Sequence, residues 1–153
     1  MKKFILKSIG LLFISVMLFS CGDDEEIERN DESIIPTNSF GRDNQVLGTV
    51  EINGRNITIS VWDHGQIDGD IVSIYVNGTK VIDEETLDGP SNKFSVSTTL
   101  DYNGYNYILL YAHNEGSISP NTAAILIDDG TSSEQFSLSS NLSTNGTVNL
   151  IVD

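Results

Sequence analysis

The sequence has one cysteine, one tryptophan, two histidines and three prolines in 153 residues. A single cysteine excludes an intramolecular disulfide, so stability must come from a packed core, with a bound metal ion as a further aid. Basic residues are also scarce, because eight lysines and arginines stand against 22 acidic residues. Such a surface repels nucleic acid and anionic lipid headgroups, so we expect no nucleic-acid partner.

Catalytic motifs are equally scarce. The sequence has neither an HExxH nor a GxSxG motif, and its two histidines are His64 and His113. A carboxylate pair for glycoside hydrolysis stays open among so many acids, although it needs a cleft that a domain this small rarely has. We therefore expect a non-catalytic protein, with a small hydrolase as the weak alternative.

The first twenty residues combine a basic start with a short apolar run. Three lysines precede residues 9–19, which are nearly all apolar. This pattern is typical of a secretory signal peptide, and the run is shorter than the roughly 20 apolar residues of a transmembrane helix. We expect residues 1–20 to be removed. Their loss takes three basic residues, which leaves five against 22 acids and a net charge of −17.

The apolar run ends in Leu18-Phe19-Ser20-Cys21, which resembles the lipobox of bacterial lipoproteins. That resemblance implies cleavage before Cys21 and attachment of lipid to it, and two or three acyl chains anchor a protein firmly. The acidic residues 22–26 resemble the export signals of surface lipoproteins in the Bacteroidota, whereas the plainer interpretation is a solvated linker. We expect a cell-envelope protein, anchored in the outer membrane through Cys21 and exposed on the surface.

Two regions follow the expected cleavage point. Residues 21–45 are rich in Asp, Glu, Asn and Ser, which predicts an acidic flexible tether. Residues 46–153 alternate between apolar and polar with period two and carry frequent turn signals, which predicts an all-β domain. The expected strands are 46–52, 55–62, 71–76, 79–82, 93–100, 105–112, 122–127, 134–139 and 147–152.

About eight or nine short strands favour an antiparallel β-sandwich with immunoglobulin-like or jelly-roll connectivity. Asn53-Gly54 and Asn77-Gly78 are expected to form hairpin turns, because both residue types tolerate positive φ. Asn145-Gly146 is expected to form another turn, just before the last strand.

The densest polar feature follows the second expected strand. Asp63, Asp68 and Asp70 lie within eight residues, with Gly65 and Gly69 between them. Carboxylates are the ligands that calcium prefers, and glycines let backbone carbonyls turn inward, so the three acids are a candidate calcium site. The spacing is not that of an EF-hand. A structural turn, in which Asp side chains cap backbone amides, is the interpretation that the sequence alone favours.

Two further features are candidates for ligand binding. Glu115 and Asn121 belong to a long polar loop after a central strand, which lies beside the first loop if the strands are neighbours, although a stiff connector is the favoured interpretation. Trp62 has the opposite parity to Ile57, Ile59 and Val61, so its ring is expected to be exposed and to offer a surface for sugar stacking.

Residues 46–152 resemble a secreted domain of Bacteroidota that has no characterised activity. The shared residues are Trp62-Asp63, Gly65, Asp68-Gly69-Asp70, Val72, Tyr75, Asn77-Gly78, Asn106, Ala112, Asn114-Glu115-Gly116 and Pro120-Asn121-Thr122-Ala123. The resemblance implies an envelope compartment and a β-sandwich fold, but no reaction. Three hypotheses follow: a non-catalytic domain that binds an envelope protein or a glycan, a calcium-stabilised carbohydrate-binding module of a polysaccharide-uptake system, and, least favoured, an enzyme.

Overall fold

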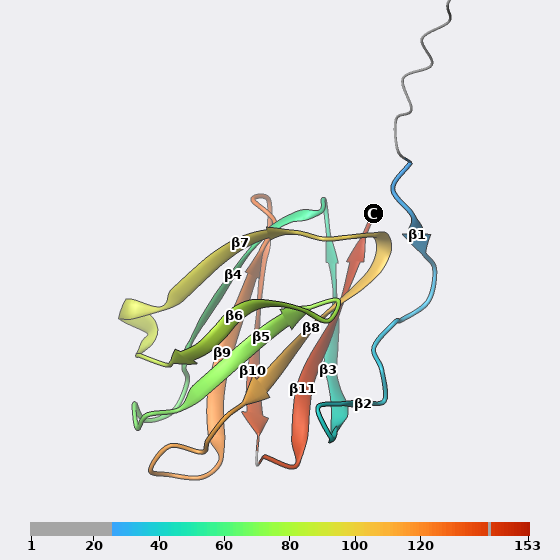
Figure 1. Ribbon diagram of the computed structural model, residues 1–153. Helices are drawn as coiled ribbons and strands as arrows, with labels where there is room; N and C mark the ends of the chain where they lie inside the picture. Colours follow the sequence, from blue (N-terminus) through green and yellow to red (C-terminus); the bar gives the residue numbers. More distant parts are fainter. Residues whose placement is uncertain (1–25, 141) are drawn as a thin grey trace, which may run out of the picture.

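The computed structural model describes residues 26–140 and 142–153, which fold almost entirely into strands (Figure 1). Cys21 and the expected signal peptide lie outside the described residues. The elements are, in chain order, β1 (Arg29–Asn30), β2 (Asn38–Ser39), β3 (Arg42–Ile52), β4 (Asn56–Asp63), β5 (Ile71–Val76), β6 (Thr79–Thr86), the 3-10 helix η1 (Pro90–Asn92), β7 (Phe94–Thr99), β8 (Asn103–Ala112), β9 (Asn121–Asp128), β10 (Ser133–Ser140) and β11 (Thr144–Val152).

The strands form two sheets. The larger sheet has the order β2-β3-β11-β8-β5-β6, with β1 paired to β8, and the smaller sheet has the order β10-β9-β4-β7. Most pairs are antiparallel, but β3 runs parallel to β11 and β1 runs parallel to β8. The expected all-β sandwich is confirmed. Its nine expected strands correspond to β3 through β11, and the two-residue strands β1 and β2 are additional.

The core lies between the two sheets and follows from the period-two pattern of the strands. In β4, for example, Ile57, Ile59 and Val61 are at most 2% exposed. Between them, Thr58 points to the other face of the smaller sheet, where its hydroxyl lies 3.0 Å from Ser97 Oγ on β7. Each buried Ile or Val side chain contributes roughly 1.5–3 kcal/mol to folding, so this alternation decides which face of each strand turns inward.

The Asn-Gly pairs behave differently from one another. Asn77-Gly78 forms the expected hairpin between β5 and β6, with φ of 49° and 86°. The hairpin expected at Asn53-Gly54 is wrong, because β3 and β4 belong to different sheets and the pair carries the chain between them. Asn145-Gly146 is not a turn either, since both residues lie inside β11.

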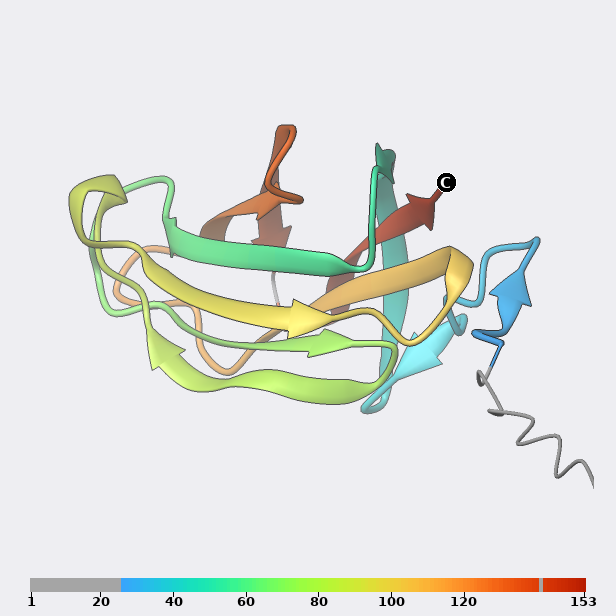
Figure 2. The ribbon, with the colours of Figure 1, turned by 90° about the horizontal axis from the view of Figure 1, so that it is seen from above.

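Residues 26–41 lie along the outside of the sandwich (Figures 1 and 2). β1 hydrogen-bonds to the start of β8, and Ser33 Oγ donates to Asn149 Oδ1 at 2.6 Å. β3 begins at Arg42, four residues before the domain boundary that we expected. Residues from Arg29 onward are therefore paired with the domain, and the expected tether through residue 45 is corrected to that extent.

Candidate metal centre

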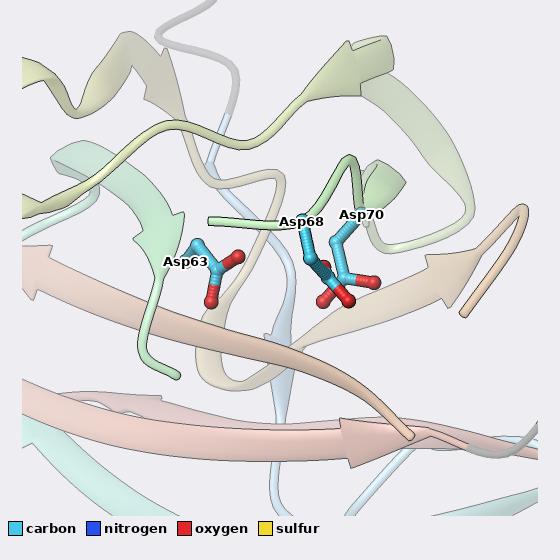
Figure 3. Close-up of side chains that lie close together, drawn as sticks. All are labelled: Asp63, Asp68 and Asp70. Carbon is cyan, nitrogen blue, oxygen red and sulfur yellow. The ribbon is translucent and has the colours of Figure 1, made fainter. Parts of the chain in front are cut away.

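Three aspartates meet at one end of the sandwich, where β4 ends and β5 begins (Figure 3). Asp63 is the last residue of β4, Asp70 directly precedes β5, and Asp68 belongs to the loop between them. One carboxylate oxygen from each lies within 4.8 Å of the others. The chain turns at Gly69, whose φ of 95° brings Asp68 and Asp70 onto the same side. The cluster expected from the sequence is therefore assembled, and it can hold a metal ion.

Each aspartate uses one carboxylate oxygen to hold the surrounding loops. Asp63 Oδ1 accepts from the Gly65 amide at 2.8 Å, and Asp68 Oδ2 accepts from the Ile118 amide at 2.6 Å. Asp70 Oδ2 accepts from the Thr122 amide at 2.7 Å. The capping role that the sequence favoured is real, but it occupies only half of each carboxylate.

The other oxygen of each aspartate has no partner. Asp63 Oδ2, Asp68 Oδ1 and Asp70 Oδ1 are buried and find no hydrogen-bond partner among the described residues. Asp63 and Asp70 are only 2% and 1% exposed. A buried polar atom without a partner costs about 1–3 kcal/mol, and more if it is charged. Turn capping does not explain three such atoms in one place, whereas a bound cation does.

The loop between β8 and β9 closes the centre, as expected if β5 and β8 are neighbours. Asn114 Oδ1 accepts from the Ile71 amide at 2.7 Å, and Asn114 Nδ2 donates to the Gly69 carbonyl at 2.8 Å. Asn121 is fully buried, and its Nδ2 donates to the Asn114 carbonyl at 3.1 Å. Asn121 Oδ1 is a fourth buried oxygen without a partner in the described part of the chain.

Three contributors to the centre were not singled out from the sequence. Thr122 donates its amide to Asp70 and its hydroxyl to Asp63 Oδ1, the latter at 3.3 Å, so it links two of the aspartates. Gly116 has a φ of 58°, and a Cβ there would collide with the Asp68 carboxylate. Asn114 is the third. In the sequence they are only members of one polar loop and of the residues that carry the resemblance, and neither signal shows which aspartate each one contacts.

Burial and repulsion between the carboxylates change the pKa of one member of the cluster, Asp70. Burial is the main cause that raises the pKa of Asp70 to about 6. The hydrogen bond from the Thr122 amide lowers this pKa, whereas the negative charges of Asp68, Asp63 and Glu115 raise it further. Glu115 is partly buried and acts on Asp70 through its charge. Carboxylates arranged in this way attract a cation, because its charge cancels the repulsion that disfavours their ionised form.

A small cavity adjoins the centre at Asp68 and Thr122. It has a volume of about 210 Å³ and is bounded by Asp68, Ile118, Pro120 and Thr122, among others. The three aspartates offer carboxylate oxygens, which suit a hard divalent cation rather than a soft metal.

Trp62 does not have the exposed ring that we expected. It is only 7% exposed, and Lys93 Nζ lies 5.4 Å from the centre of its ring. Strand alternation places the side chain on the face away from Ile57, Ile59 and Val61, but Lys93, from the connection between β6 and β7, lies over the ring. The connection between β6 and β7 therefore covers a position that strand parity alone places at the surface, and the Trp62 ring is not a surface for sugar stacking.

Comparisons with known proteins give no identity: no family model matches the sequence, and no curated protein or solved structure is significantly similar to it. Among the described residues, no helix is long and apolar enough to span a bilayer.

Proposed function

We propose that the protein is a non-catalytic, lipid-anchored binding domain of the cell envelope, and that a calcium ion ties its loops together at one end. The observation that carries the metal site is the set of four buried oxygens without partners, three from aspartates and one from Asn121. The anchor rests on the sequence around Cys21, and the strongly negative charge of the chain suits an environment outside the cytoplasm.

Calcium fits these donors better than magnesium does. Calcium accepts six to eight oxygens in flexible geometry, whereas magnesium demands a near-ideal octahedron and keeps most of its water. The donors here come from two loops and include an amide as well as carboxylates, and three of them are deeply buried. Such a mixed and largely dehydrated set favours the larger ion.

The ion would have a structural effect. Asp63 ends β4, Asp70 leads into β5 and Asn121 begins β9, so one ion would join both sheets. A ligand that binds only the folded state stabilises it by about 2.7 kcal/mol at a concentration of 100 Kd. For a domain of this size, that corresponds to a rise in Tm of roughly 5–10 °C.

A catalytic role has little support at the histidine that has a serine partner. Ser73 Oγ lies 2.8 Å from His113 Nε2, which is the contact expected of a nucleophile and its base. Ser73 is fully buried, however, and also accepts from the Glu84 amide at 3.0 Å. Its hydroxyl is out of reach of a substrate, so we assign this pair a structural role.

Terbium luminescence and thermal melting together test the metal site. Trp62 is the only tryptophan and directly precedes Asp63, so a bound terbium ion should be sensitised when Trp62 is excited. We expect terbium emission that calcium displaces, and a Tm that calcium raises relative to EDTA. With Asp70→Asn or Asn121→Ala, at least tenfold more metal ion should be needed to reach half of the terbium emission and half of the rise in Tm.

Asp43→Asn is the matched control, because Asp43 is an exposed carboxylate of β3 and its removal changes the net charge equally. Its calcium response should equal that of the unaltered protein. A Tm that is the same in EDTA and in calcium, together with absent terbium emission, would overturn the proposed metal site.

Replacement of Cys21 with Ser tests the anchor separately. Without the thiol no lipid can be attached, so we expect the variant to accumulate as uncut precursor or to leave the membrane fraction, while metabolic labelling with a fatty acid should mark only the unaltered protein. A Cys21→Ser variant that is still processed and membrane-bound would disprove the lipid anchor.

A further inference from the structure

Three aromatic rings form a contiguous patch on the outer face of the larger sheet. Phe40 lies between β2 and β3, Tyr75 on β5 and Tyr111 on β8, and we call these three the aromatic platform. The Phe40 ring centre lies 4.7 Å from that of Tyr75 and 5.4 Å from that of Tyr111. Phe40 remains 57% exposed in spite of these contacts. The platform therefore presents a ring to solvent and supports it from beneath.

The backbone at Phe40 is held in an unfavourable conformation. Ser39 pairs with Arg42, so Phe40 and Gly41 form a two-residue hairpin turn, with φ of 55° and 78°. A turn with positive φ at both positions favours Asn-Gly, because most L residues are strained there. This chain uses Asn-Gly at its other turn of this kind, Asn77-Gly78.

Phe40 is thus a poor turn former at a position where Asn would fit better. Packing against two tyrosines offsets part of the cost, but Phe40 is more than half exposed, and its exposed surface gains nothing from burial. Backbone strain of this kind persists chiefly where a side chain is needed in a fixed place for binding. We therefore interpret Phe40 as a residue kept for contact with a ligand, and not as one that stabilises the turn.

Two of the few cations of the chain support the platform. The Arg42 guanidinium lies 4.0 Å from the centre of the Tyr111 ring and donates to the Tyr111 hydroxyl at 3.0 Å and to the Ala112 carbonyl at 2.7 Å. Lys80 Nζ lies 5.9 Å from the Tyr75 ring centre and is paired with Asp83 at 2.6 Å. Lys80 is paired with Asp83, and Arg42 is held by hydrogen bonds to two neutral oxygens, so both cations hold the rings in place.

We infer that the aromatic platform binds a neutral glycan, with a pyranose ring stacked on Phe40. The C–H groups of a pyranose face carry partial positive charge and pack on the negative face of an aromatic ring. The net charge of −17 that remains without residues 1–20 repels acidic saccharides, nucleic acid and anionic lipid, whereas a neutral glycan meets no such barrier. This inference rests on the proposed binding role and names its ligand class, but it does not depend on the metal site.

Affinity electrophoresis of the lipid-free chain (residues 22–153), with soluble polysaccharides in the gel, tests the inference. The probes are xyloglucan, laminarin and galactomannan as neutral glycans, and polygalacturonate as an acidic one. We expect retardation by at least one neutral probe and none by polygalacturonate. Phe40→Asn should abolish this retardation, with at least a tenfold loss of affinity, whereas Phe40→Trp should retain it.

The same variants separate binding from folding. Phe40→Asn removes a strained residue from the turn, so its Tm should equal or exceed that of the unaltered protein even though it no longer binds. Phe94→Ala is the control, because Phe94 is 42% exposed on β7 of the other sheet, and its removal should leave binding unchanged.

The outcomes are distinct from those for calcium. No retardation by any neutral probe, retardation by polygalacturonate alone, or undiminished binding by Phe40→Asn would each overturn the glycan inference. A Tm that fails to respond to calcium, with glycan binding intact, would overturn the metal site and leave this inference standing.

Discussion

At the scale of single residues, the metal centre shows how one carboxylate serves two purposes. Asp70 Oδ2 fixes the Thr122 amide, whereas Asp70 Oδ1 is buried without a partner. Burial disfavours the ionised form, and Asp68 and Asp63 add repulsion, which together raise the pKa of Asp70 to about 6. In the absence of metal, Asp70 is therefore a residue that opposes folding at neutral pH.

This conflict predicts an unusual pH dependence for the metal-free protein. The pKa of Asp70 is higher in the folded state than the ordinary 3.8, so the folded state binds the proton first as the pH falls. Stability contributed by Asp70 is then present below pH 4 and lost as the pH rises through 6, a change of roughly 2–3 kcal/mol. Chemical denaturation in metal-free buffer at pH 7 and pH 5 should show the protein to be more stable at pH 5.

Asp70→Asn provides the comparison, because it removes the titrating group and retains the shape of the side chain. The variant should have a shallower dependence between pH 5 and 7, and the difference between the two slopes isolates Asp70 from the general effect of net charge. Equal slopes would show that Asp70 does not titrate in this range. Calcium should reverse the trend, because it binds the ionised carboxylate.

At the scale of elements, the three Asn-Gly pairs show that one motif can occupy three environments. Asn77-Gly78 turns a hairpin, and Asn77 also accepts from the Tyr107 amide at 2.9 Å and donates to Asn106 at 2.7 Å. Asn53-Gly54 crosses between the sheets, where the Asn53 side chain and amide both bind Asp129. The pair inside β11 is extended. The intrinsic turn propensity of Asn-Gly is the same in each case, and the pairing of the flanking strands decides whether the two residues form a turn.

Alanine substitutions should distinguish the first two pairs. Asn77→Ala places alanine in positive φ, where Asn is better tolerated. It also removes the hydrogen bonds that Asn77 makes to the Tyr107 amide and to the buried Asn106, so we expect a loss of about 2–4 kcal/mol in the free energy of unfolding. Asn53→Ala retains the backbone bond to Asp129 and should cost less than about 1 kcal/mol. Urea denaturation of both variants measures the difference. Equal costs would contradict the distinct roles.

At the scale of the whole molecule, a parallel pair joins β3, the first long strand of the described residues, to β11, the last one. β3 pairs along almost its whole length with β11, and Val50 and Ile52 of β3 belong to the core. The segment before β3 is attached more loosely, through the short β1–β8 pair, the Asn103 amide to the Glu28 carbonyl at 2.9 Å, and Ser33 to Asn149. Stability should therefore depend far more on β3 than on what precedes β2.

Truncation tests this division. A chain that begins at Asn38 loses a few hydrogen bonds and no core strand, so it should fold with a loss of about 1–3 kcal/mol. A chain that begins at Asn53 also loses β3 and exposes an edge of β11, and it should not fold, because natural domains are stable by only about 5–15 kcal/mol. Circular dichroism and thermal melting distinguish these results. A folded chain without β3 would contradict the proposed importance of the parallel pair.

The sequence by itself determined the all-β class, the nine longer strands and the acidic loop, because these depend on local alternation, on turn residues and on spacing within a few residues. Asp63, Asp68 and Asp70 are close in the chain, so their clustering was accessible. That Glu115 and Asn121 lie beside them was predicted only conditionally, since it required neighbouring strands, and the contribution of Thr122 was not predicted.

Only the tertiary structure decided which oxygens of Asp68 and Asp70 are capped and which have no partner, because their capping amides belong to Ile118 and Thr122, 50 and 52 residues away in the chain. It also buried Trp62 beside Lys93 of the connection between β6 and β7. Phe40, which the sequence assigned to a flexible tether, lies instead on a platform with Tyr75 and Tyr111. Alternation along a strand predicts the face of the sheet on which a side chain lies, but it does not predict whether another segment covers that face. Contacts between distant segments settle that, and here they move the candidate glycan surface from the smaller sheet to the larger one.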